Sequence, residues 1–150
     1  FMAKKKELII SWMLLVIWMI FIFIMSSFNG NISSNQSNTI ATILYSIFNI
    51  ESNSNVIFIV RKCAHVSEYF VLGILTFNLA SKYGVKLTYL FSFLFCILYA
   101  SSDEFHQLFV SGRVGSMTDI FIDMIGIITA LLIMYLFNKF KTKLFSNDNS

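Results

Sequence analysis

The sequence contains four apolar stretches of roughly membrane-spanning length. They cover residues 8–25, 56–80, 87–110 and 117–137. A helix needs roughly 20 apolar residues to cross the hydrocarbon core of a bilayer, because each residue adds about 1.5 Å. Charged residues make up 13% of the 150 residues, whereas a water-soluble domain carries about 25%. We therefore predict an all-α membrane protein with four transmembrane helices in a single domain over residues 2–150.

The first apolar stretch follows a short basic segment, Lys4 to Lys6. This order is also compatible with a secretory signal. The stretch is long for a signal sequence, and no small-x-small cleavage site follows it. We therefore predict a retained membrane anchor, and we set Phe1 aside as an addition before Met2.

A segment rich in Ser and Asn, residues 26–55, separates the first two apolar stretches and is typical of a loop or surface region. Within it, residues 39–50 place apolar side chains at helical spacing. Twelve or so residues are too few to cross a bilayer. We predict a short amphipathic helix that lies on the membrane surface or folds over a neighbouring site.

The positions of the basic residues predict an orientation. With four spans, three basic clusters fall on one side of the membrane: residues 4–6, 82–86 and 139–143. The positive-inside rule then places both termini in the cytoplasm. Arg61, Lys62 and Arg113 fall on the outer side, against this rule. They are therefore expected to pair with acidic groups or to hold an anion.

Three of the apolar stretches carry stripes of mainly polar residues at spacing i, i+4, i+7, which places each stripe on one helix face. The stripes are Arg61, His65 and Glu68; Tyr99, Asp103 and His106; and Asp119, Asp123 and Gly126. In the four-span topology all three lie in the outer half of the bilayer. Charged groups there are costly and usually mark a functional site inside the protein. We expect a shared polar pocket, with Gly126 allowing close helix approach.

The residue types in this pocket suggest acid–base or nucleophilic chemistry on an anionic substrate. A His can act as base or nucleophile when a carboxylate orients it, and Arg clamps a phosphate or carboxylate. The candidate catalytic residues are His65, Glu68, Asp103, His106 and Asp119. The candidate substrate-binding residues are Arg61, Arg113, Tyr69, Tyr99, Glu104 and Gln107.

Three alternatives remain open at this point. The pairs His65-x-x-Glu68 and Asp103-x-x-His106 offer N and O ligands that suit Zn²⁺ or Mn²⁺. Nearby arginines would repel a cation unless acidic groups outnumber them, so we assign no metal ligand and leave the cofactor unknown. The pocket could also serve lipid binding or transport with a proton relay, or it could be a network that only locks the helices.

The motifs resemble those of the VanZ-like family. They are Arg61-Lys62-x-Ala64-His65-x-x-Glu68-Tyr69, Tyr99-Ala100-x-x-Asp103-Glu104-x-His106-Gln107 and Gly112-Arg113-x-Gly115-Ser116-x-x-Asp119, in this order. Ser26-Ser27 after a Trp-containing first span adds to the resemblance, and Ser111 replaces a usual Pro. The resemblance implies a small multi-pass membrane protein, linked in the family's namesake to resistance to the glycopeptide teicoplanin.

On this basis we expect a protein of the cell membrane whose site faces the extracellular side. It would modify or handle an anionic cell-envelope lipid or lipid-linked cell-wall precursor, as a membrane-embedded hydrolase or transferase. The alternatives are a binding or transport protein without catalysis and a metal-dependent membrane hydrolase. An oligomer is possible, and the sequence has no basic stripe typical of nucleic-acid binding. Cys63 and Cys96 are expected to be small buried hydrophobic residues without a disulfide.

Overall fold

The computed structural model describes residues 2–48 and 54–147. These residues form five helices and no strand, which confirms the all-α class. The helices are α1 (Met2–Ser27), α2 (Gly30–Phe48), α3 (Ser54–Lys82), α4 (Thr88–Gln107) and α5 (Met117–Asn147). Four of them contain most of the predicted apolar stretches. The third stretch ends earlier than expected, because α4 stops at Gln107 and not near Val110.

The helix α2 begins nine residues before the short helix predicted from sequence, so the predicted loop is largely helical. Its first turn is stabilised by Asn29, whose Oδ1 accepts a hydrogen bond from the backbone N–H of Ile32 at 2.9 Å. Ser33, Ser37 and Ala41 are buried at spacing i, i+4, i+8, and α2 contacts α3. This tertiary packing outweighs the modest helix propensity of Ser and Asn. Residues 49 and 50 of the predicted helix lie outside the described residues.

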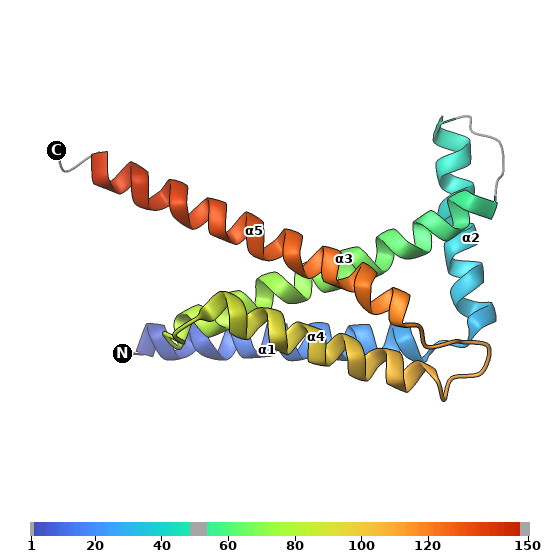
Figure 1. The fold of residues 1–150 in the computed structure, drawn as a ribbon, viewed down its shortest axis with the longest axis horizontal. Helices are drawn as coiled ribbons and strands as arrows, with labels where there is room; N and C mark the ends of the chain where they lie inside the picture. The colour runs from blue at the N-terminus through green and yellow to red at the C-terminus, as the bar shows by residue number, and fades with distance from the viewer. Residues whose placement is uncertain (1, 49–53, 148–150) are drawn as a thin grey trace.

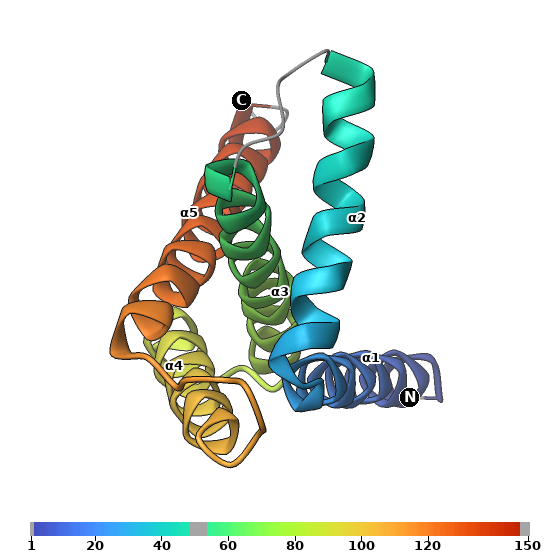
Figure 2. The same ribbon diagram turned by 90° about the vertical axis from the view of Figure 1, so that its right-hand side faces the viewer.

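The central helix is α3, which contacts each of the other four helices. The helices α1 and α4 run in one direction, and α3 and α5 run in the other (Figure 1). Both termini lie at the same end of the molecule (Figure 1). At that end Lys82 of α3 donates a hydrogen bond to Ser11 of α1 at 2.7 Å. At the opposite end α2 crosses the other helices, and it stands beside α3 in Figure 2.

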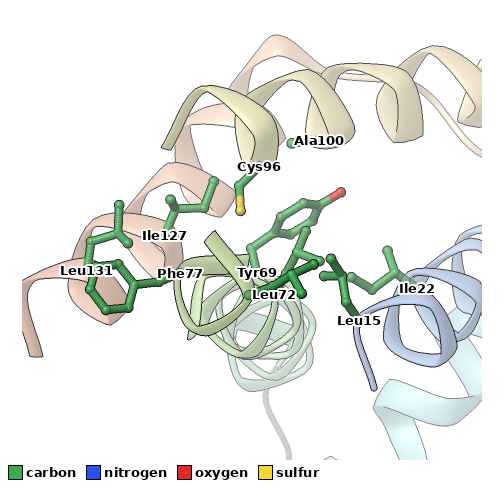
Figure 3. Close-up of a cluster of buried hydrophobic side chains, with 10 residues drawn as sticks. Leu15, Ile22, Tyr69, Leu72, Phe77, Cys96, Ala100, Ile127 and Leu131 are labelled. Atoms are coloured by element: carbon green, nitrogen blue, oxygen red, sulfur yellow. The ribbon is translucent and has the colours of Figure 1, made fainter. Parts of the chain in front are cut away.

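The buried core surrounds Tyr69 and Leu72 of α3, which lie between α1 on one side and α4 and α5 on the other (Figure 3). Cys96 is fully buried in this cluster, as expected from sequence. Cys63 is exposed, so the prediction that it is buried was wrong. Both cysteines are free thiols, as predicted.

Three helices among the described residues are long and apolar enough to cross a membrane. The spans are Lys4–Ser27, Ser54–Lys82 and Met117–Leu144. Large apolar side chains on them face outward, for example Ile17 of α1 and Phe137 of α5. Such a surface suits lipid and not water. The helix α4 is not among the three, since its last two turns carry the polar run from Ser101 to Gln107.

Candidate functional site

A cavity of about 380 Å³ opens at the end of the molecule that α2 crosses. Five of the predicted site residues line it: Arg61, His65, Glu68, Asp103 and Arg113. They come from α3, from α4 and from the loop between α4 and α5. The stripe of α3 therefore meets Asp103 of the α4 stripe in one cavity. The wall contributed by α2 is polar and includes Ser33, Gln36 and Ser37.

Two arginines place positive charge on this cavity. Nη2 of Arg61 lies 3.5 Å from Oγ of Ser33 on α2. Arg113 donates from Nε to the carbonyl of Phe28 and from Nη2 to the carbonyl of Met25, both at 3.1 Å. Both carbonyls lie at the C-terminal end of α1, where the negative end of the helix dipole favours a cation. Burial lowers the pKa of Arg113, and the nearby charge of Arg61 lowers it further.

A hydrogen-bonded network on α4 holds the acidic side of the site. Gln107 donates from Nε2 to Oδ2 of Asp103 and to Oε1 of Glu104, both at 3.2 Å. Oε2 of Glu104 accepts the backbone N–H of Ser116 at 2.8 Å. Oε1 of Gln107 accepts from Nη1 of Arg113 at 3.5 Å. The network thus ties the carboxylates of α4 to the loop that carries Arg113.

The contact between α3 and α5 brings His65 and Asp123 together. Nδ1 of His65 lies 3.5 Å from Oδ1 of Asp123. Asp123 is fully buried, and neither of its carboxylate oxygens has a hydrogen-bond partner among the described residues. One turn closer to the start of α5, Asp119 forms an ion pair with Lys62. The stripe of α5, which consists of Asp119, Asp123 and Gly126, therefore packs against α3 and is not part of the cavity lining.

Six predicted site residues do not line the cavity. Tyr69 is buried in the apolar core. The hydroxyl of Tyr99 donates to the carbonyl of Met19 on α1 at 2.6 Å. The ring of His106 packs on Phe23 with centroids 4.6 Å apart. Asp119 is occupied by its ion pair with the lysine of α3. The other two, Glu104 and Gln107, support the cavity through the network on α4.

The sequence analysis offered a helix that folds over the site as one alternative for this segment, but it named none of the α2 residues that line the cavity. Ser33 and Ser37 are both buried and both line the cavity, one helical turn apart. Their spacing of four residues was the available signal. Ser26, at the end of α1, is a further lining residue with a buried hydroxyl.

These features define a small helical membrane protein with a charged cavity at one end of its bundle. The sequence model of the VanZ/LLP1 family matches residues 11–138. The chain belongs to this family, which confirms the resemblance noted from its motifs. No curated protein and no solved structure matches the chain significantly.

Proposed function

We propose that this protein binds and modifies an anionic cell-envelope lipid or a lipid-linked cell-wall precursor. The observation that supports this proposal best is the pair Arg61 and Arg113 on one cavity beneath α2. Guanidinium groups bind phosphate and carboxylate groups in fork geometry. A cavity of about 380 Å³ lies at the small end of ligand pockets. It has room for a charged headgroup, while acyl or prenyl chains remain in the bilayer.

The course of the chain supports four spans. The helices α3 and α5 run in the same direction (Figure 1). The chain must return between them, and α4 is the segment that makes this return. If α3 and α5 both cross the bilayer, α4 therefore crosses it as well. Its polar last turns face the site and the other helices, which lowers the cost of their burial.

The distribution of basic residues supports an orientation with both termini in the cytoplasm. The helix α3 ends at Lys82, and its link to α4, which contains Lys86, lies at the end of the molecule that holds both termini (Figure 1). The positive-inside rule places this end in the cytoplasm. The cavity then opens on the extracellular side of the cell membrane. There, α2 would lie along the membrane surface, since Ile40, Ile43 and Ile47 on it are exposed.

The groups on the cavity suit transfer or hydrolysis at a phosphate or carboxyl centre. His65 is the histidine that lines it, beside Glu68 and Asp103. A histidine near carboxylates can take a proton from water or from an acceptor hydroxyl. The arginines would neutralise the charge that develops on the substrate. Loss or masking of such a lipid-linked group would change glycopeptide susceptibility, the property to which the family's namesake is linked.

The test has a cellular arm and a biochemical arm. The wild-type protein and the variants His65→Gln and Asp103→Asn are produced at matched membrane levels in a teicoplanin-sensitive Gram-positive host. We expect the wild type to raise the inhibitory concentration of teicoplanin, and both variants to lose the effect. Equal susceptibility with and without the wild-type protein would contradict the link to resistance.

The biochemical arm separates modification from binding alone. Purified protein is incubated with a polyprenyl-phosphate-linked precursor and, separately, with phosphatidylglycerol, and the products are followed by mass spectrometry. A product that depends on His65 supports a hydrolase or transferase. Ligand retention without any product would overturn catalysis and favour the binding or transport role.

A further inference from the structure

Three side chains from three different helices converge behind the cavity wall. His65 of α3, Glu104 of α4 and Asp123 of α5 each offer one ligand atom, and these atoms all lie within 4.8 Å of one another. Ligand atoms that surround a Zn²⁺ ion at about 2.1 Å are roughly 3.4 Å apart. A small contraction of the three side chains would therefore complete a coordination set. This set differs from both of the pairs that the sequence suggested.

Asp123 gives an independent reason to expect a ligand here. Its side chain is fully buried, and among residues 2–48 and 54–147 neither carboxylate oxygen has a hydrogen-bond partner. Nδ1 of His65 is also buried and without such a partner in the same part of the chain. A buried carboxylate without hydrogen bonds is costly, and buried charges are usually paired or bound to a metal. A cation between these atoms would satisfy all of them.

The charge balance around the three ligands has room for a divalent cation. The electrostatically coupled acidic groups are Glu68, Asp103, Glu104, Asp119 and Asp123. The basic groups with them are Arg61, Lys62 and Arg113. With the carboxylates ionised and the histidine neutral, three positive and five negative charges leave a net charge of −2. The acidic groups therefore outnumber the basic groups. This meets the condition under which the nearby arginines would not repel a cation.

The supporting contacts match those of metal sites. Oε2 of Glu104 accepts the backbone N–H of Ser116, and Oε1 accepts from Gln107. Bonds of this kind orient a ligating carboxylate. Each carboxylate oxygen has a further lone pair that can reach a metal.

We infer that His65, Glu104 and Asp123 bind a divalent transition-metal ion such as Zn²⁺ or Mn²⁺. Three N and O ligands suit these ions and leave coordination positions for water or substrate. Because His65 also lines the cavity, the ion would supply a Lewis acid next to the anion-binding arginines. Metal binding does not depend on lipid binding, so either proposal can fail while the other holds.

The first experiment measures metal content directly. The purified protein is stripped with a chelator, reloaded with Zn²⁺ or Mn²⁺, freed of excess ion and analysed by elemental mass spectrometry. We expect about one ion per folded chain. His65→Gln and Asp123→Asn should each weaken binding by more than the ~10–100-fold that loss of an outer-shell group costs. Glu7→Gln removes an exposed carboxylate at the other end of α1 and should leave the metal content unchanged.

Two further variants decide between ligand sets. His106→Gln should retain the ion, because His106 contacts Phe23 and Ser27. If the His106→Gln variant lost the metal, Asp103-x-x-His106 would again be the candidate ligand pair, and our ligand set would be overturned. His65→Cys keeps a ligand, and Co²⁺ bound to it should show the near-ultraviolet band of a thiolate complex, which the wild type lacks. Absence of this band in folded, Co²⁺-loaded protein would also contradict the assignment.

The metal content of the wild-type protein tests the proposal even if a variant fails to fold. Wild-type protein that is folded and holds no Zn²⁺, Mn²⁺ or Co²⁺ after reloading would overturn the proposal. In that case a proton shared between His65 and Asp123 would account for the buried pair.

Discussion

The carbonyl oxygen of Val66 on α3 lies where a side chain at Gly126 of α5 would have to stand. A Cβ atom at Gly126 would come within 2.2 Å of this oxygen. The two helices therefore approach almost backbone to backbone, as small residues allow. The approach occurs one residue after His65 and three residues after Asp123. It sets the register that brings Nδ1 of His65 to 3.5 Å from Oδ1 of Asp123.

Gly126→Ala should therefore destabilise the fold. A methyl group there must push α3 and α5 apart, because the atom that it meets is backbone. Overpacking of this kind costs about 1–3 kcal/mol, which outweighs the about 1 kcal/mol that Ala gains over Gly in a helix. Thermal unfolding in detergent should show a lower midpoint. Ile128→Ala, on the exposed face of the same helix, should change it little. Equal midpoints for Gly126→Ala and the wild type would show that the helices do not touch here.

Arg113→Lys should destabilise the protein more than Arg61→Lys does. Arg113 bonds the carbonyls of Met25 and Phe28, and a lysine cannot reach both in the same geometry. A hydrogen bond to a charged group contributes about 1.5–3 kcal/mol. Arg61 approaches Ser33 at 3.5 Å, and its substitution should mainly affect the ligand. Chemical denaturation of the two variants measures the difference. A larger loss for Arg61→Lys would reverse these roles.

Lys62 and Asp119 should be energetically coupled, because they form an ion pair at a partly buried position. A double-mutant cycle with Lys62→Met and Asp119→Asn should give a coupling energy of about 0.5–3 kcal/mol in unfolding experiments. Strict additivity would mean that the pair does not form, which would leave Asp119 available as the catalytic group first expected from sequence.

The membrane orientation predicts opposite labelling of two engineered cysteines. In a background without Cys63 and Cys96, Ser111→Cys in the loop before α5 should react with a membrane-impermeant maleimide on intact cells. Lys139→Cys, near the other end of α5, should react only after permeabilisation. The reverse pattern would place both termini outside, and labelling of both sites on intact cells would contradict the four-span topology.

The sequence predicted the fold class and the meeting of the α3 stripe with Asp103 of α4, because helical periodicity and the cost of buried charge act locally. It did not predict the length of α2. The first half of that helix is polar, and it is helical because Ser33, Ser37 and Ala41 pack on α3. Helix propensity and hydropathy cannot predict this contact, because it depends on residues of α3 that lie far away in the sequence.

The sequence also could not decide which residues of a stripe face the cavity. On α4 the buried face runs through Cys96, Ala100, Asp103 and Gln107. His106 and Gln107 are both compatible with helical spacing from Asp103. Packing against α1 turns the histidine toward Phe23 and leaves the amide in the network. A step of one residue along α4 thus separates a side chain that supports the cavity through this network from one that packs on α1.

Retention of an anionic lipid by purified protein tests the central claim most directly. Native mass spectrometry would compare bound phosphatidylglycerol with bound phosphatidylcholine for the wild type, Arg61→Gln and Lys86→Gln. Lys86→Gln makes the same charge change on an exposed residue between α3 and α4. We predict that the wild type and Lys86→Gln prefer phosphatidylglycerol, and that Arg61→Gln loses ~10-fold or more of this preference. Equal retention of both lipids by the wild type, or equal losses in both variants, would contradict an anion site built around Arg61 and Arg113.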